Sequence, residues 1–583
     1  MFRSSSPHGP AGSHSPHDDR TPDRRTVLAT AALGAAAGLG AGLGLSGDTA
    51  AAGPTGRPRT ATASHVLSGR APVRAPSAEG TTLDSVALPG QAGPGGYRRL
   101  TASPGWKRLV RTKLADPKSS EDKRAEKRTP LASFVQLTDL HLVDVQHPLR
   151  YEYLRTETPS AWRPHETLSV AGAVALIERV NRLKGGPATG APLSFVITTG
   201  DNTDNNCTAE LEWFLTVMSG GRITPNTGDP KGYEGVQNSD SKLYWHPDSA
   251  LRDRDKQAGY PRVKGLLEAA LREVNSPGLG LPWYSTVGNH DALPGGCFAT
   301  GDDFFTDFAL GGRKMIELDD SSDAKKLWAT IEDGSDPSGE NFRELLKSRR
   351  GTMRRVTPDE KRRPFTRTEY VRKHLDPRWA GAGPVGHGYG QQHLDGGKLY
   401  YSFEVSEDVA GISLDTTRKD GNFKGRVGTE QLGWLERELK RHRKDGKYVI
   451  VFSHHTSTTT PEGGDEVVAL LNKHPHAVAW INGHTHKNTI RAQDTFWEVS
   501  TASHIDFPQL ARVVELTDNQ DGTLSLFTTL IESAAPAETD YTDLSQTGLA
   551  SLYRELGFND PGKRPGLMGD ANDRNTELLL RKP

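Results

Sequence analysis

Cysteine is scarce in this sequence of 583 residues, which has only Cys207 and Cys297. Two thiols cannot build a disulfide-rich scaffold or a zinc site made of cysteines. An excess of charge is also absent, because 72 Lys and Arg stand against 73 Asp and Glu. A formal charge of −1 provides no field over the whole protein that attracts nucleic acid or an anionic membrane. This balance disfavours a nuclease, and no nucleic acid is expected as a partner.

The composition indicates a folded protein. Hydrophobic residues make up 34% and charged residues 25% of the chain. These fractions allow a sizeable core with long loops and argue against global disorder. The 20 histidines exceed what packing requires. We therefore expect a soluble, globular enzyme.

Residues 1–52 resemble a twin-arginine export signal. Arg24 and Arg25 precede an uncharged run of Ala, Gly and Leu, which is followed by the small residues Ala50–Ala52. The uncharged segment Thr26–Gly47 is long enough to span a bilayer as an anchor, but its Ala and Gly content makes it weakly hydrophobic. We therefore expect the twin-arginine (Tat) export machinery as a partner and an extracellular or cell-envelope location. We expect no stable membrane span in the mature form.

Changes in composition divide the rest of the chain. We expect a disordered linker at 53–79, an N-terminal extension at 80–130, a folded domain at 131–534 and a polar C-terminal tail at 535–583 with one short helical patch, Leu549–Leu556. Within the extension, the pattern predicts a hairpin formed by Tyr97–Leu100 and Lys107–Arg111. A charged insertion, 302–392, interrupts the domain. Its basic part, Arg343–Lys373, is either a flap over an anionic substrate or a solvated helical face or mobile loop.

Five short apolar runs in the folded domain each have the length of a buried strand. Amphipathic helical segments lie between several of them. This alternation predicts an α/β layered architecture with helices outside a sheet. The runs are Phe134–Leu137, Leu193–Thr198, Trp283–Val287, Tyr448–Phe452 and Ala477–Ile481, and the helical segments are Val170–Leu183, Glu210–Met218 and Leu432–Arg443.

A polar turn rich in His and Asp follows each run. The turns are Asp139-Leu140-His141, Gly200–Asp204, Gly288–Asp291, His454-His455 and Gly483–His486. In an open α/β sheet the carboxyl ends of the strands face one crevice, so these five turns should meet there. Carboxylate, amide and imidazole donors without thiolate suit first-row divalent ions such as Mn, Fe, Zn or Ni. The donors are too many for one ion and enough for two ions that share a bridging ligand.

These five motifs, in this order, resemble the calcineurin-like metallophosphoesterase superfamily. The resemblance covers roughly Leu131–Asp506 in separated blocks. It implies an α/β (α+β layered) fold of two mixed β-sheets flanked by helices, here with a long insertion. The export signal and the insertion further resemble an exported bacterial subgroup of that family.

The resemblance also implies a site with two divalent metal ions. One ion would be held by Asp139, His141 and His486, and the other by Asn289, His454 and His484. Asp201 would bridge the two ions. Two cations held in this way lower the pKa of bound water and offset charge on phosphoryl oxygens. The implied reaction is hydrolysis of a phosphate mono- or diester by attack of a metal-bound hydroxide, with a small phosphoester as the substrate.

Two further residues have implied roles in the reaction. His290 is expected to give a proton to the leaving oxygen or to stabilise the transition state. Asp204 is expected to orient His290 by accepting a hydrogen bond from it. Because all seven ligand positions and both of these positions are filled, a non-catalytic, metal-bound surface binding protein is the weaker alternative. A cyclic-nucleotide or glycerophosphodiester phosphodiesterase is the alternative within the enzymes.

Some residues near these motifs have less certain roles. His455 is expected to lie behind the ligands, because only one of two adjacent strand residues faces the metals easily. Asn205, His455, His504 and Asp506 are candidate substrate contacts, with plain packing as the alternative for the last two. Cys207 and Cys297 follow two of the turns and form either a disulfide that clamps the site or two free buried thiols.

Overall fold

The structure is a computed structural model, and it describes residues 74–299, 303–318, 320–562 and 564–583. The predicted export signal at 1–52 and residues 53–73 of the predicted linker lie outside the described residues. Within the described part of the chain, no helix has the length and apolar character needed to cross a membrane.

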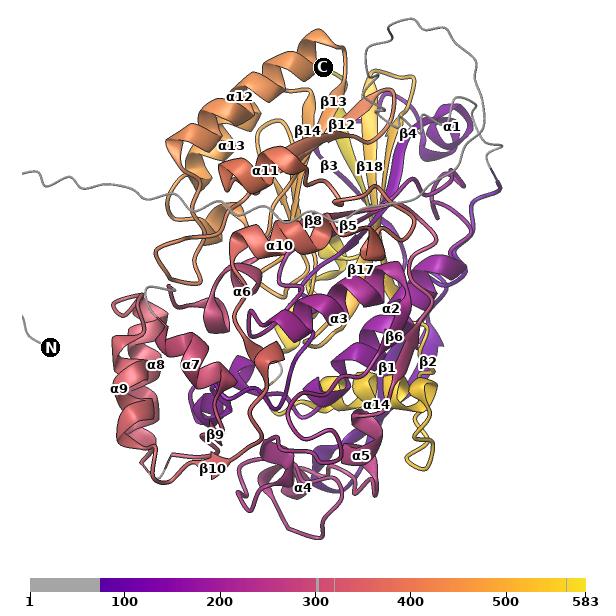
Figure 1. Ribbon diagram of the computed structural model, residues 1–583. Coiled ribbons are helices and arrows are strands. Elements are labelled where there is room, and N and C mark those ends of the chain that lie inside the picture. Colours follow the sequence, from indigo (N-terminus) through magenta and orange to yellow (C-terminus); the bar gives the residue numbers. More distant parts are fainter. Residues whose placement is uncertain (1–73, 300–302, 319, 563) are drawn as a thin grey trace, which may run out of the picture. The chain divides into compact units, whose positions relative to one another are not determined.

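Two mixed β-sheets form the centre of the structure (Figure 1). The first has seven strands and the second has six, and both combine parallel with antiparallel pairs. In spatial order the first contains β3 (Leu109–Leu114), β19 (Thr576–Arg581), β18 (Thr523–Glu532), β17 (Leu510–Asp518), β4 (Thr129–Leu137), β5 (Val196–Thr199) and β8 (Trp283–Thr286). The second contains β11 (Tyr401–Glu404), β12 (Val409–Ser413), β13 (Tyr448–Phe452), β14 (Ala477–Asn482), β16 (Trp497–Ser500) and β15 (Thr489–Ala492).

The two sheets pack against each other and helices cover their outer faces. One apolar cluster joins Phe134 and Ile197 of the first sheet to Ile450 and Ile481 of the second. A second cluster joins the first sheet to α2 (Ser169–Arg182) and α3 (Thr208–Ser219), and a third joins the second sheet to α12 (Thr429–Lys444) and α13 (Gly464–Asn472). The predicted fold of two mixed sheets flanked by helices is therefore confirmed.

The parallel strands place the predicted turns at one end of both sheets. β4, β5 and β8 run parallel to one another, and so do β12, β13, β14 and β16. Hydrogen bonds between the sheets hold their carboxyl ends together. Gln136 Nε2 donates to the carbonyl of Asn482 at 3.0 Å, and His454 Nδ1 donates to the carbonyl of Thr199 at 2.8 Å. The layered packing thereby sets up a single crevice.

Two predictions about the chain ends are wrong. The hairpin of Tyr97–Leu100 with Lys107–Arg111 does not form, because β2 (Arg98–Pro104) pairs with β1 (Ser85–Ala92) and β3 pairs with β19. The segment 535–583 is not only a polar tail. The predicted helical patch Leu549–Leu556 lies within the largely buried helix α14 (Gln546–Asn559), but the segment also contributes the strand β19 inside the first sheet, which was not predicted. Both errors have one cause, since long-range strand pairing decides where these short segments lie.

The insertion 302–392 forms helices with a small core of their own. Phe305, Leu327 and Phe342 pack together with Tyr153 and Leu154 from outside the insertion. Figure 1 shows α7, α8 and α9 grouped at the lower left. The helices are α7 (Phe304–Leu310), α8 (Ser321–Asp333), α9 (Glu340–Ser348), α10 (Arg367–His374) and α11 (Gln391–Gly396).

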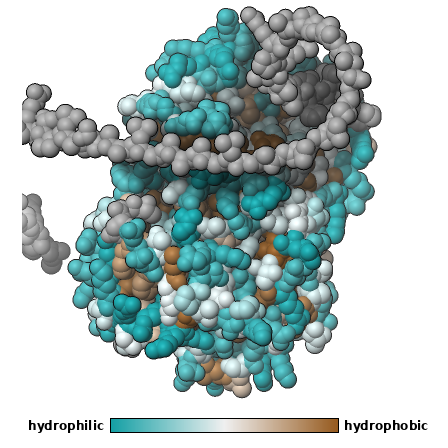
Figure 2. Space-filling model, in the orientation of Figure 1, coloured by the Kyte–Doolittle hydropathy of each residue, from teal (hydrophilic) through white to brown (hydrophobic). Residues whose placement is uncertain are grey.

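The remaining elements are short. They are α1 (Glu121–Lys127), α4 (Arg254–Gln257), α5 (Leu266–Ala270), α6 (Asn289–Ala292), and the strand pairs β6 (Gly221–Ile223) with β7 (Val274–Ser276) and β9 (Arg313–Lys314) with β10 (Arg354–Arg355). The face drawn in Figure 2 is largely hydrophilic, with separate hydrophobic patches. Among the described residues, the only large hydrophobic side chains classed as exposed are Val110 and Val385.

Candidate metal centre

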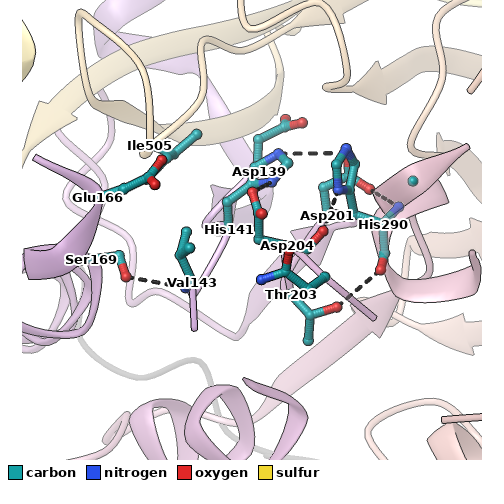
Figure 3. Close-up of polar contacts among 12 residues, drawn as sticks. Asp139, His141, Val143, Glu166, Ser169, Asp201, Thr203, Asp204, His290 and Ile505 are labelled. Carbon is teal, nitrogen blue, oxygen red and sulfur yellow. Dashed lines mark hydrogen bonds and ion pairs between the residues drawn. The ribbon is translucent and has the colours of Figure 1, made fainter. Parts of the chain in front are cut away.

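Each predicted ligand follows the strand that the sequence indicated. Asp139 follows β4, Asp201 follows β5, Asn289 follows β8, His454 follows β13 and His484 follows β14. The folded chain brings all five turns together. Figure 3 shows Asp139, His141 and Asp201 converging with His290 from separate elements.

One group of donor atoms consists of Asp139, His141 and His486. Their donor atoms all lie within 4.8 Å of one another, and the three residues are buried. His486 Nε2 is 3.2 Å from Asp139 Oδ1, and His141 Nε2 is 3.6 Å from Asp201 Oδ2. This is the set that the sequence assigned to the first ion.

A second group surrounds His454 Nε2. This atom is 3.0 Å from Asn289 Oδ1, 3.1 Å from Asp201 Oδ2 and 3.2 Å from His484 Nδ1. Oδ2 of Asp201 therefore approaches donor atoms of both groups, while its Oδ1 accepts the backbone N–H of His290 at 2.9 Å. A single carboxylate oxygen between two donor sets is the arrangement that a bridged pair of cations requires.

The backbone is unusual at this site. Five of the seven predicted ligands have positive φ, a region that non-glycine residues rarely adopt. Such conformations cost about 1–3 kcal/mol each and gather at functional sites, where the surroundings enforce them. The φ values are 50° for Asp139, 40° for His141, 50° for Asp201, 65° for His484 and 53° for His486.

Neighbouring groups orient the oxygen ligands. Asp139 Oδ2 accepts hydrogen bonds from Thr138 Oγ1 at 2.6 Å and from the backbone N–H of His484 at 3.1 Å, so its Oδ1 faces the donor group. The side-chain amide of Asn289 donates through Nδ2 to the carbonyl of Gly296 at 3.1 Å. That bond leaves Asn289 Oδ1 directed at the cluster.

Carboxylates and carbonyls orient the imidazole ligands in the same way. His486 Nδ1 lies 2.6 Å from Asp506 Oδ2, and His141 Nδ1 lies 3.1 Å from Asp204 Oδ1. Because ionised carboxylates only accept, each Nδ1 carries the proton and each Nε2 presents a lone pair. Metal-binding histidines commonly have such a partner behind them.

The electrostatics of the site favour added positive charge. Asp139 Oδ1 and His141 Nε2 are buried and have no hydrogen-bond partner. Burial lowers the pKa of His454 and of His486, but the carboxylates of Asp201 and Asp139 outweigh burial and raise both values to about 9. The oxygen and nitrogen donors, the unpaired atoms and the two carboxylates of Asp139 and Asp201 all fit two divalent cations.

Close packing leaves no room for a side chain at Gly483. A Cβ atom there would lie 2.0 Å from Thr138 Oγ1 and 2.4 Å from Asp139 Oδ2. The residue before His484 must therefore be glycine if Asp139 is to keep its orientation. This explains the glycine of the fifth turn.

Asp204 contacts His290 in a different way from the one expected. His290 Nδ1 donates to the backbone carbonyl of Asp204 at 2.6 Å, so the hydrogen bond exists but does not involve the carboxylate. The carboxylate instead contacts His141 and forms an ion pair with Arg150. The side chain of Asp204 thus orients a predicted metal ligand, and its main chain orients His290.

The four residues predicted as candidate substrate contacts have different surroundings in the structure. Asp506 lines the cavity described below. The side chain of Asn205 hydrogen-bonds to Glu210 at 2.6 Å. Both ring nitrogens of His455 are engaged, by Thr416 and by the carbonyl of Phe423, and the buried ring of His504 packs near Tyr553. Of these four residues, Asp506 lines the cavity, and His455 has a ring nitrogen within 4.8 Å of donor atoms of His454 and His484.

The predicted disulfide is absent. Cys207 and Cys297 are free and buried. They belong to two different apolar clusters, one beneath the first sheet and one around the insertion. Burial raises the pKa of the Cys297 thiol to about 12. The alternative of two free buried thiols is the correct one.

A cavity of about 330 Å³ opens onto the donor groups and includes residues that the sequence did not identify. Arg163, Tyr151, Trp328 and Asp560 line it beside His290. Trp328 lies on α8, so the insertion contributes to the wall, but none of the described residues of the basic stretch 343–373 does. No sequence signal marked Trp328 or Asp560.

Another missed residue, Asp291, joins two of the turns. Its carboxylate accepts the backbone N–H groups of Gly288, Asn202 and Thr203 at 2.9–3.1 Å. Asp291 therefore locks the turn after β8 onto the turn after β5. Its position in Gly288–Asp291 was the available signal.

Comparisons with known proteins found distant similarities to solved structures and a match to one family model. A dimetal phosphatase from Danio rerio is 11% identical with a TM-score of 0.35, covering 70% of this chain and 100% of its own. PhoD is 13% identical with a TM-score of 0.27, covering 74% of this chain and 70% of its own. A purple acid phosphatase from yellow lupin seeds is 10% identical with a TM-score of 0.26, covering 77% and 57%. No curated protein shows significant similarity. A sequence model described as calcineurin-like phosphoesterase matches residues 132–488, more than half of the chain.

Proposed function

The chain belongs to the calcineurin-like phosphoesterase family, and we propose that it uses two divalent cations to hydrolyse a phosphate mono- or diester. As a member it is a metal-dependent hydrolase of phosphoester bonds. The observation that carries the proposal is the position of Asp201 Oδ2, 3.6 Å from His141 Nε2 and 3.1 Å from His454 Nε2. That oxygen approaches donor atoms of both groups.

The proposed ligand sets follow the two groups of donor atoms. Asp139, His141 and His486 hold one cation, Asn289, His454 and His484 hold the other, and Asp201 touches both. When bound, two such cations supply positive charge that lowers the pKa of water and offsets the charge of phosphoryl oxygens. The chain's part is to keep the donors fixed, which the bonds to Asp204, Asp506, Thr138 and Gly296 support.

We assign the proton transfer to His290. It lines the cavity beside Asp201 and Asn289, and its Nδ1 proton is committed to the carbonyl of Asp204 at 2.6 Å. The nitrogen left to give a proton to a leaving oxygen is therefore Nε2. A positioned imidazole of this kind typically contributes about 10²–10⁴-fold to the rate.

Two buried arginines act as positioning residues. Arg150 forms ion pairs with Asp204 and Glu166, and Arg163 pairs with Asp506. Asp204 and Asp506 in turn contact His141 and His486. Each arginine thus holds a carboxylate that orients an imidazole, so it reaches the proposed metals only through other residues.

Metal analysis and a substrate panel test this proposal. We expect about two divalent ions per chain and metal-dependent hydrolysis of at least one ester among p-nitrophenyl phosphate, an alkyl phosphate, bis-p-nitrophenyl phosphate, a cyclic nucleotide and a glycerophosphodiester. Removal of the ions by a chelator should abolish hydrolysis, and adding them back should restore it. Exclusive hydrolysis of the last two esters favours the diesterase alternative. No hydrolysis with both ions bound supports the metal-bound surface binding protein instead.

We also propose that the protein is exported through the Tat machinery. The support is the sequence alone, in which Arg24 and Arg25 precede a weakly apolar run and the small residues Ala50–Ala52. Export should require both arginines. A chain with Arg24→Lys and Arg25→Lys should therefore remain inside the cell, whereas the unchanged chain should be exported. Equal amounts of the two chains outside the cytoplasm would contradict the proposal.

A further inference from the structure

The cavity extends beyond the donor groups onto a wall built by two segments that are remote in the sequence. Trp328 and Glu332 come from α8 of the insertion, and Asp560 directly follows α14. Trp328 and Glu332 are four residues apart, so they share one face of their helix. The chain therefore places an aromatic ring and two carboxylates in the cavity that receives the phosphoester.

Three half-buried aromatic residues belong to this wall. Tyr151, Trp328 and Phe423 line the cavity and pack against the same apolar cluster. The hydroxyl of Tyr151 donates to the carbonyl of Gly295 at 2.8 Å, which holds its ring in place. Aromatic rings attract cations, and tryptophan does so most strongly.

Asp560 is a buried carboxyl group that lines this cavity. It is only 7% exposed, and its Oδ1 accepts the N–H of Gly562 at 2.8 Å. Its Oδ2 has no hydrogen bond or ion pair with any described residue. The nearby Arg155 and Arg163 are already paired with Asp255 and Asp506. Neither of these guanidinium groups is therefore paired with Asp560.

This carboxyl group lines the cavity, where a ligand reaches it. Burial raises the pKa of Asp560 to about 7, because a buried carboxylate without a cation is costly. A positively charged group in the cavity would stabilise its ionised form. The volume of about 330 Å³ is at the lower end of the range of roughly 300–1,000 Å³ for ligand pockets, which suits a small substrate.

We propose that the substrate is a phosphoester of an amino alcohol, whose ammonium group binds between Trp328 and Asp560 while its phosphate lies at the metal centre. The inference rests on the proposed function and names its substrate class. Glu332 also lines the cavity and adds negative charge there. Arg564 also lines the cavity and is exposed. A leaving group that carries a carboxylate would bind to Arg564 instead.

Two esters of the same shape test the inference. Phosphocholine carries a quaternary ammonium group, and 3,3-dimethylbutyl phosphate has carbon in place of that nitrogen. For the metal-loaded protein we expect kcat/KM to favour phosphocholine by at least about 10-fold, as a desolvated cation beside an aromatic ring and a carboxylate implies. Free choline should inhibit competitively.

Matched variants assign the preference to the wall. Asp560→Asn keeps the acceptor for Gly562 and should reduce the preference to within about 3-fold by raising KM for phosphocholine, with the neutral ester unaffected. Trp328→Ala should do the same, and Trp328→Phe should restore part of the preference. Arg564→Gln is the control and should retain it.

The outcomes separate this inference from the function on which it rests. Equal kcat/KM on the two esters, together with no inhibition by choline, would overturn the amino alcohol while leaving the phosphoesterase intact. The inference would also be overturned if the protein preferred an ester whose leaving group carries a carboxylate, and if Arg564→Gln removed that preference. Failure to hydrolyse any ester of the panel, with both ions bound, is instead the failure of the proposed function.

Discussion

Replacing Asp201 by Asn should remove most of the bound metal and almost all of the hydrolysis. The bridging oxygen approaches donor atoms of both groups, and an amide supplies neither its negative charge nor its capacity to bridge. We expect metal content to fall from about two ions per chain to one or none, and kcat/KM to fall by at least about 10³-fold. That exceeds the loss of about 10–100-fold that is typical when a partner behind a ligand is removed.

Elemental analysis and rates on the same preparation measure this effect. Glu515→Gln is a suitable control, because Glu515 is also a buried carboxylate that accepts hydrogen bonds from Thr189 and Ala188, but it lies on β17 away from the cavity. The control should keep both ions and the rate. Full metal content and an unchanged rate in Asp201→Asn would place the active site elsewhere.

The ligands were predictable from the sequence because their positions in the fold depend on the short strands that directly precede them. Asp139, Asp201, Asn289, His454 and His484 each follow a short apolar run, and buried parallel strands end in the same crevice. Knowing the strands was therefore enough to bring the turns together. The glycine before His484 and the Asp after His290 belong to the same local patterns.

The residues of the cavity wall could not be predicted in this way. Trp328 and Asp560 lie in an insertion and after a C-terminal helix, and only tertiary packing brings them to the cavity. The role of Asp204 was missed for another reason. A sequence names the residue but does not say whether its carbonyl or its carboxylate faces His290. The same limit applies to Cys207 and Cys297, which follow neighbouring turns yet enter different apolar clusters.

The insertion connects fold and specificity. Its helices have a core of their own, which includes Phe305, Leu327 and Phe342 and packs on Tyr153 and Leu154 just after the first turn. This packing fixes α8 beside the crevice, so that one face of α8 enters the cavity wall. The donor groups come from the two sheets, whereas part of the wall comes from added segments. Such a division allows the substrate to change while the metal chemistry is kept.

Replacing His290 by Asn should preserve both metal ions and still lower kcat by about 10²–10⁴-fold, the usual contribution of a positioned proton donor. His290 is not among the seven proposed ligands, and its Nδ1 bond to the carbonyl of Asp204 leaves Nε2 for the leaving oxygen. The loss should depend on the leaving group. An alkyl phosphate needs the proton and should lose the full factor, whereas p-nitrophenyl phosphate has a stable leaving anion and should lose much less.

A buried histidine outside the site provides the control for this variant. His476 hydrogen-bonds to the carbonyl of Leu439 at 2.9 Å beneath α12, so His476→Asn should change neither the metal content nor the ratio of the two rates. Equal losses on both esters in His290→Asn would mean that the imidazole stabilises the phosphoryl group and gives no proton to the leaving oxygen. Loss of a metal ion would instead make His290 a ligand. It would then bind an ion together with His141 and Asp201, whose donor atoms lie within 4.8 Å of its own.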